Sequence, residues 1–384
     1  MVDRPPIRYF DHAATSWPKP PVVTAAMVAA LETASGNPGR GAHRLALEAE
    51  RVIAAARSSL AGLLGVADER DLAFVPGCTY ALNLVLKGLL APGDRVVVSS
   101  VEHNAVTRPL AALATGGVNV VTVPADAEGH VDPDDVERAV AAERTAAVVC
   151  QHASNVSGVI QPVGDLADIA HEHGALMVVD GAQAAGHLDI DLAALGADAY
   201  VVPGHKGLLG PQGIGAVYLS PGCEPHGLVQ GGGGRDSAAA AQVSERPDRY
   251  EAGTPNVPGI AGLGAAAELP RAEGPAIRAA ERRLARRLHE AVAAMPAFRV
   301  LGPPVLEERV PVVTVVHATR APDEIAFELE RSAGIAVRAG LHCSPWTHQA
   351  LGTFETGAVR LSVGWGLTDE DVDVVLESLA ALGG

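Results

Sequence analysis

The chain has 384 residues, of which 48% are apolar and only 3% aromatic, and its formal net charge is −16. This length allows one large α/β domain and a smaller one, because single hydrophobic cores stop growing near ~250–300 residues. The acidic balance and the lack of a Lys/Arg-rich block argue against nucleic acid or an anionic membrane as a partner.

The N-terminal stretch contains an early Asp and two prolines and lacks the apolar core of a signal peptide. No run of the sequence approaches the ~20 apolar residues of a membrane span, so we expect a cytoplasmic protein without a membrane partner. Residues 20–34 and 42–66 are rich in Ala, Leu and other helix formers, and both segments are predicted to be helices.

From residue 71 to about 220, short β-branched runs alternate with amphipathic stretches, which is typical of βαβ units around a mainly parallel sheet. Helices are predicted at 78–90 and 164–174. The predicted strands of this one seven-stranded sheet are 72–75, 95–100, 118–123, 146–151, 175–180, 199–203 and 214–219.

The segment GGGGRDS at 231–237 predicts a mobile loop or a hairpin. A helix at about 259–294 then leads into predicted strands near 297–300, 309–317 and 357–363, with helices near 323–333 and 368–382. We therefore expect an N-terminal segment (1–20) that joins the small lobe, a large α/β domain (21–258) and a small C-terminal α+β domain (259–384).

Polar residues follow several of the predicted strands, at the edge of the sheet where ligands of α/β proteins bind. The chain has only three lysines, and one of them, Lys206, stands in such a position. Lys87 is expected on a helix surface and Lys19, between two prolines, in a surface turn. The polar segments after strands are 76–79, 102–104, 152–155, 180–183 and 204–207.

These residue types match the protein parts that pyridoxal 5'-phosphate (PLP) requires, namely a lysine, a carboxylate for the ring nitrogen, a phosphate cup and a stacking ring. Lys206 would hold the cofactor covalently and Asp180 would keep its pyridine nitrogen protonated. Thr79 and His205 would hold the phosphate at the start of a helix, and His103 would stack on the ring. Taken singly, Asp180 is as consistent with a helix cap, and His103 with an ordinary histidine at a strand end.

Long motifs over almost the whole chain resemble the class V branch of fold-type I PLP enzymes, and within it the group II cysteine desulfurases and selenocysteine lyases. The motifs include YFDHAATSWPKP (9–20), HASNVSGVIQP (152–162), DGAQAAGHLDIDLAALGADAY (180–200), GHKGLLGPQGIG (204–215), EAGTPNVPGIAGL (251–263) and VRAGLHCSPWTHQALGT (337–353). The resemblance implies the fold-type I architecture and a homodimer with PLP sites between the subunits.

The resemblance also implies roles for individual residues. Lys206 and His103 would take part in catalysis. The residues expected to bind the cofactor are Cys78, Thr79, His103, Asp180, Gln183, His205 and Lys206, with Thr254 reaching in from the partner subunit. Asn155, Arg338 and Arg360 would bind the substrate, since a guanidinium pairs bidentately with a carboxylate. Pro203 stands where relatives commonly have Ser or Thr, which removes one hydrogen bond to the phosphate.

Cys343 maps to the family's sulfur-accepting cysteine, and Arg338 upstream could favour its thiolate. Without the resemblance, a single cysteine is more simply a buried apolar residue, and Cys150 within a strand keeps that interpretation. No metal site is indicated, because the four cysteines lack metal-ligand spacing.

The predicted function is conversion of L-cysteine to L-alanine, with the sulfur passing to Cys343 as a persulfide and then to an acceptor protein or a thiol. Three alternatives stay open at this point. A β-lyase acting on cysteine, selenocysteine or another C–S substrate and a class V aminotransferase would not need Cys343. A catalytically inactive sulfur-relay scaffold would need neither Lys206 nor Asp180.

Overall fold

The seven β-branched runs between residues 71 and 220 form one sheet in the computed structural model, which describes residues 5–39, 41–232 and 240–383. The strand order is β2-β8-β7-β6-β5-β3-β4, with β8 antiparallel to both of its neighbours and every other pair parallel. The strands are β2 (Leu72–Val75), β3 (Arg95–Ser99), β4 (Asn119–Val123), β5 (Ala147–Gln151), β6 (Leu176–Asp180), β7 (Ala199–Pro203) and β8 (Gly215–Leu219). The predicted mainly parallel α/β sheet is confirmed.

Both faces of this sheet are covered by helices, which explains why its strands are apolar on both sides. Successive side chains of a strand point to opposite faces, so Val96 and Val98 enter one core and Val97 enters the other. One face is covered by α3 (Cys78–Leu89) and α4 (Asn104–Thr115), and the other by α2 (Arg44–Leu64), α5 (Pro133–Ala142), α6 (Val163–Glu172) and α7 (Leu192–Leu195).

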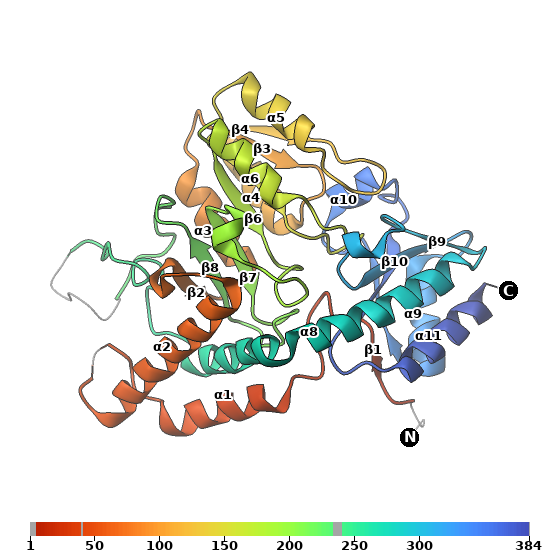
Figure 1. Ribbon diagram of the computed structural model, residues 1–384, viewed down its shortest axis with the longest axis horizontal. Helices are drawn as coiled ribbons and strands as arrows, with labels where there is room; N and C mark the ends of the chain where they lie inside the picture. Colours follow the sequence, from red (N-terminus) through yellow and green to blue (C-terminus); the bar gives the residue numbers. More distant parts are fainter. Residues whose placement is uncertain (1–4, 40, 233–239, 384) are drawn as a thin grey trace.

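A third core lies in the C-terminal lobe, which is drawn in blue in Figure 1. Its sheet is antiparallel in the order β12-β13-β10-β9, and a two-residue strand near the N-terminus, β1, pairs with β11. The elements are β1 (Arg8–Tyr9), β9 (Phe298–Val300), β10 (Val312–His317), α9 (Pro322–Ala333), β11 (Ile335–Ala336), β12 (Arg338–Gly340), α10 (Pro345–Ala350), β13 (Ala358–Ser362) and α11 (Asp369–Leu382).

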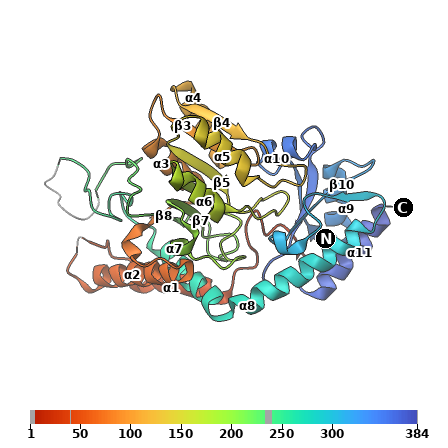
Figure 2. The same ribbon diagram turned by 45° about the horizontal axis from the view of Figure 1, so that its top comes forward.

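The long helix α8 (Val257–Ala293) connects the two lobes and runs along both of them (Figures 1 and 2). Leu263 near its start is buried in the core under the large sheet, whereas Leu288 near its end is buried in the C-terminal core. Helix α1 (Pro21–Thr33) packs beside it. The proposed domain boundaries at residues 20 and 258 stay a prediction. Helix α8 begins next to the second boundary and contributes to the cores of both lobes.

The predicted elements lie within a few residues of the observed ones, while the helices α4, α5, α7 and α10 and the short strands β1, β11 and β12 were not predicted from the sequence. Two short 3-10 helices, η1 (Glu69–Asp71) and η2 (Leu306–Glu308), complete the chain. Most of the glycine-rich segment predicted as a loop or hairpin, residues 233–237, lies outside the described residues. None of the helices that the structure describes is long and apolar enough to cross a membrane.

Candidate active site

A cavity of about 500 Å³ opens at the carboxyl ends of β5, β6 and β7 and brings together most of the predicted site residues. Because these three strands are parallel neighbours, the polar residues that follow them meet at one edge of the sheet. The predicted residues that line the cavity are Cys78, Thr79, His103, Asn155, Asp180, Gln183, His205, Lys206, Arg338 and Arg360. Cys343 and Thr254 do not line it.

Lys206 and Asp180 both line this cavity, with Asp180 at the end of β6 and Lys206 three residues after the end of the neighbouring strand β7. Asp180 is the last residue of β6, and its Oδ1 accepts a hydrogen bond of 3.0 Å from the Ala182 N–H. Burial raises the pKa of Asp180, against the opposing effects of Lys206 and of that N–H. Burial has the opposite effect on a cation and lowers the pKa of Lys206, while the negative forms of Cys78 and Asp180 act to raise it. The lysine amine therefore loses its proton more readily than a lysine in water.

The N-terminus of α3 and His205 also line the cavity. Gly77 precedes the helix at φ +153°, and no side chain caps the first turn, which carries Cys78 and Thr79. Nδ1 of His205 is buried and has no hydrogen-bond partner among the described residues. Burial, together with Lys206 and Lys19, lowers the pKa of His205 to about 4. Free helix N–H groups and a hydroxyl at one point suit a phosphate.

Lys19 is bonded to the backbone of His205, which the sequence did not reveal. Its Nζ donates to the Ser16 Oγ at 2.8 Å and to the His205 carbonyl oxygen at 3.1 Å. The residue is half-buried, and burial lowers its pKa to about 8. The bend at Trp17 and Pro18 is exposed, as expected of a surface turn, but the Lys19 amine bonds to the Ser16 hydroxyl and the His205 carbonyl oxygen. The two prolines around it were the available signal that this turn is held in one conformation.

His103 and Gln183 are each fixed by a hydrogen bond to the backbone. His103 caps α4, with its Nδ1 accepting from the Ala105 N–H at 3.0 Å, so a neutral ring carries its proton on Nε2. Burial, helped by Lys206 and nearby arginines, lowers the pKa of His103 to about 4. Gln183 donates from Nε2 to the Ala13 carbonyl oxygen at 2.9 Å. The site therefore presents a neutral imidazole and an oriented carboxamide.

Arg360 is fully buried at the side of the cavity, and its charge is balanced by a residue far away in sequence. Its Nη2 lies 2.7 Å from Oδ1 of Asp11, and its Nη1 donates to the Asn155 carbonyl oxygen at 3.0 Å. Its buried Nε has no partner within the described part of the chain. Sequence reasoning missed Asp11, although it lies in the YFDHAAT motif that carries the resemblance.

The loop that carries Cys343 has an unusual backbone, with φ of +52° at His342 and +58° at Cys343. Residues other than glycine rarely adopt this region, because it costs of order 1–3 kcal/mol per residue, and they stay there only when neighbouring groups hold them in place. Asn155 does so with both ends of its carboxamide. Its Nδ2 donates to the His342 carbonyl oxygen at 2.8 Å, and its Oδ1 accepts from the Ser344 hydroxyl at 2.7 Å.

Cys343 itself is exposed at the rim of the cavity. Its Sγ lies 3.1 Å from Nη2 of Arg338, which does line the cavity. Its carbonyl oxygen accepts from the Asn104 N–H at 2.9 Å, next to His103. By contrast, Cys150 is buried in β5, as its sequence context predicts. Cys343 therefore has solvent on one side and a cation from the cavity on the other.

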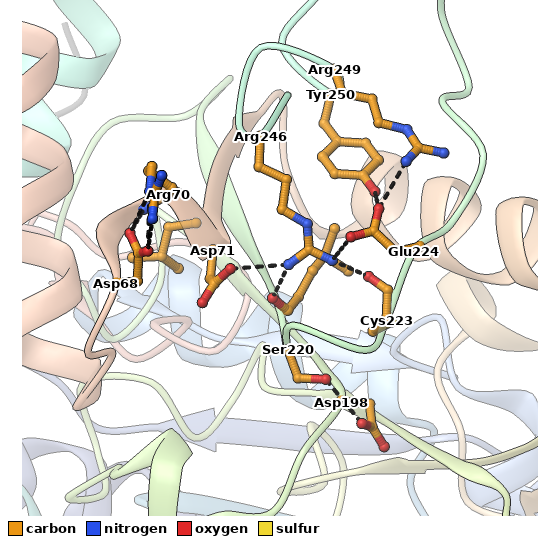
Figure 3. A network of polar contacts seen from close by, with 12 residues as sticks. Asp68, Arg70, Asp71, Asp198, Ser220, Cys223, Glu224, Arg246, Arg249 and Tyr250 are labelled. Atoms are coloured by element: carbon orange, nitrogen blue, oxygen red, sulfur yellow. Dashed lines mark hydrogen bonds and ion pairs between the residues drawn. The ribbon is translucent and has the colours of Figure 1, made fainter. Parts of the chain in front are cut away.

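Thr254 lies elsewhere, in a hollow of about 670 Å³ that it shares with residues of α2. The segment before it is tied to the outer part of the large lobe by the polar network in Figure 3. Arg246 bridges Asp71 at 3.0 Å and Glu224 at 2.8 Å, and Arg249 also binds Glu224 at 2.8 Å. Within one subunit, Thr254 therefore does not reach the cavity that holds Lys206.

The residues of the cavity fit PLP in chemical type. The cavity is lined by an amine, a buried carboxylate, a neutral imidazole, an uncapped helix start and a second imidazole with an unpaired buried nitrogen. These are the groups that the cofactor needs for its aldehyde, pyridine nitrogen, ring face and phosphate. Among the described residues, no group of three or more His, Cys, Asp or Glu side chains is placed to hold a metal ion.

Comparison with known proteins agrees with this geometry. The model of the family "Aminotransferase class-V" matches residues 8–375. A probable cysteine desulfurase from Methanothermobacter thermautotrophicus is 36% identical over 98% of this chain and 94% of its own length. The apo structure of the cysteine desulfurase from Thermococcus onnurineus NA1 superposes with a TM-score of 0.92 at 32% identity, covering 98% of this chain and 94% of that one.

A cysteine desulfurase from Escherichia coli, crystallised in an S-sulfonic acid form, is also similar, with a TM-score of 0.87 at 30% identity over 97% of this chain and 94% of that one. The family match spans both lobes and includes every residue that lines the cavity. The chain therefore belongs to the class-V aminotransferase family of PLP-dependent enzymes.

Proposed function

We propose that the protein is a cysteine desulfurase that takes sulfur from L-cysteine, releases L-alanine and carries the sulfur as a persulfide on Cys343. The observation that carries this proposal is the position of Cys343, which is exposed beside the cavity with its Sγ 3.1 Å from Arg338. A β-lyase or an aminotransferase of this fold would not need a thiol at this place. The similarity to proteins named cysteine desulfurase over nearly the whole chain supports the same function.

In this proposal, Lys206 holds PLP, while Asp180 keeps the pyridine nitrogen protonated and Gln183 contacts the ring oxygen. Thr79 and His205 bind the phosphate, with Cys78 beside them in the same turn. His103 stacks on the ring as a neutral imidazole, which suits its lowered pKa of about 4. The buried fork of Arg360 binds the substrate carboxylate through groups that its pairing with Asp11 leaves available. Asn155 also contributes there, through the loop that it holds.

When bound, PLP withdraws electrons from the substrate and makes its α-proton acidic. Nζ of Lys206, whose pKa is lowered by burial, accepts that proton as the general base. The Cys343 thiolate then attacks the substrate sulfur, so that an S–S bond forms as the substrate C–S bond breaks. The electron pair of the broken bond stays with the carbon skeleton, which takes up a proton from solvent at Cβ, regains one from Lys206 at Cα and leaves as alanine. The persulfide sulfur passes to an acceptor protein or a thiol.

The same proposal includes a homodimer in which Thr254 of each subunit completes the phosphate site of the other. Its position outside its own cavity supports this arrangement. Exposed apolar side chains on α1 and α2 provide a surface for a second copy, namely Val22, Val28, Leu31, Leu45 and Leu47. We also keep the cytoplasm as the proposed location, since the net charge and composition suit it.

The test is to incubate PLP-loaded protein with L-cysteine and identify the carbon product. Alanine that disappears in Cys343→Ala, with PLP still bound, would support the desulfurase. Pyruvate and ammonia, formed equally well by Cys343→Ala, would instead show a β-lyase and leave Cys343 without a role. Lys206→Ala serves as the matched control, because it should lose both the covalently bound cofactor and every product.

A further inference from the structure

Two buried histidines next to Cys343 form a hydrogen-bonded chain that no step of the proposed reaction uses. Nε2 of His342 lies 3.2 Å from the Arg338 carbonyl oxygen, and its Nδ1 lies 3.0 Å from Nε2 of His348. Nδ1 of His348 in turn lies 2.7 Å from the hydroxyl of Thr353. The three side chains that these hydrogen bonds connect are at least 98% buried, namely those of His342, His348 and Thr353.

The position of each proton in this chain follows from its end at Arg338. A backbone carbonyl oxygen can only accept, so Nε2 of His342 must carry a proton, and Nδ1 of a neutral ring is then an acceptor. Nε2 of His348 must therefore donate to it, which leaves Nδ1 of His348 as the acceptor for the Thr353 hydroxyl. When both rings are neutral, this is the only order of protons that satisfies all three contacts.

The surroundings keep both rings neutral. Burial lowers the pKa of His342 to about 2, with the positive charges of Arg360 and Arg338 acting in the same direction. Burial lowers the pKa of His348 to about 4. With His348 protonated on Nε2, a proton added to Nδ1 of His342 would place two N–H groups against each other between the rings. The chain is therefore stable over the whole physiological pH range.

These hydrogen bonds span the loop in which His342 and Cys343 have the unfavourable positive φ values. They connect Arg338, whose guanidinium contacts Sγ, through His342 at φ +52° to the end of α10. Asn155 holds the same loop from the opposite side, through the His342 carbonyl and the Ser344 hydroxyl. A left-handed pair of non-glycine residues persists only when its surroundings fix it.

We propose that Thr353, His348 and His342 are positioning residues that keep Sγ of Cys343 against Arg338. Their hydrogen bonds form a relay of neutral groups in which each proton has one fixed place. The inference rests on the proposed function only in that Cys343 is the sulfur acceptor. The proton order and the reactivity of the thiol can both be measured without turnover.

The proton order is tested by ¹⁵N NMR of the histidine side chains in the full-length, PLP-loaded protein. The signals are assigned by their loss in His342→Gln and His348→Gln. Both rings should show the tautomer protonated on Nε2 and should not titrate between pH 5 and pH 8. A proton on Nδ1 of either ring, or a titration within that range, would overturn the relay.

The positioning role is tested by the rate at which iodoacetamide alkylates Cys343, followed by peptide mass spectrometry at neutral pH. Thr353→Val removes the donor to His348 and should slow alkylation by roughly 3- to 10-fold, the effect of one lost hydrogen bond. Thr353→Ser, which keeps the hydroxyl, should restore the rate. The matched control is Thr347→Val, which removes an equally buried hydroxyl of α10 that bonds the Val101 carbonyl oxygen instead.

Equal alkylation rates in Thr353→Val and wild type, or an equal loss in Thr347→Val, would refute the positioning role. In a protein that already carries Arg338→Gln, adding Thr353→Val should change the alkylation rate little further, because the contact between Arg338 and Cys343 Sγ is already absent. Failure of the proposed function would look different. The protein would then make no alanine from cysteine, although the tautomers and alkylation rates matched the expectation.

Discussion

The carboxyl group of Glu102, next to His103, is buried without a countercharge and should make the protein less stable as the pH rises. Its side chain is fully buried, and Oε1 accepts from the Ser99 hydroxyl at 2.5 Å and from the Gln151 N–H at 2.8 Å. Oε2 has no partner among the residues that the structure describes. Burial, with a smaller effect of Asp180, raises the pKa of Glu102 from 4.5 to about 8.

The sign of the pH effect follows from proton binding. In the unfolded chain this carboxyl loses its proton near pH 4.5, whereas in the folded protein it keeps the proton until about pH 8. Between these values the folded state binds more protons, so the free energy of unfolding falls as the pH rises and levels off above pH 8. The two pKa values correspond to a total loss of about 5 kcal/mol, as an upper limit.

Glu102→Gln should remove this loss, because the amide keeps the oxygen that accepts both hydrogen bonds and cannot ionise. We expect urea titrations between pH 5 and pH 9 to show wild-type stability falling relative to the variant by several kcal/mol, of the order of that limit. Glu290→Gln, on an exposed part of α8, is the control for the loss of one negative charge. A constant difference between wild type and Glu102→Gln across this pH range would refute the reasoning.

Two further substitutions test how the site is supported. Gly186→Ala should lower PLP occupancy strongly, because a Cβ there would lie 2.1 Å from the carbonyl oxygen of Gly207, the residue after the proposed cofactor lysine. Gly174→Ala, also at positive φ but with open space around it, should leave the cofactor absorbance unchanged. Glu251→Gln should destabilise the protein by about 2–4 kcal/mol in urea titrations, because it breaks a largely buried bidentate pair with Arg57 at 2.8 and 2.9 Å, and a loss below ~0.5 kcal/mol would contradict that value.

The sequence by itself determined the large sheet and the centre of the site. Runs such as 72–75 and 199–203 are apolar on both faces, which is a local property that neighbouring residues alone encode. Because the carboxyl ends of parallel strands meet, Asp180 and Lys206 could be placed together before their distance was known. The motif resemblance supplied candidate roles, and the cavity contains ten of the twelve residues that were named.

Tertiary structure decided the contacts between segments that lie far apart along the chain. The pairing of Arg360 with Asp11 joins residues 349 positions apart, and no local pattern indicates it. The hydrogen bond from Asn155 to the Cys343 loop and the order of protons from Thr353 to Arg338 depend on how side chains of different elements are oriented toward one another. Periodicity and motifs carry no such information, because these contacts form only when separately encoded elements pack against one another.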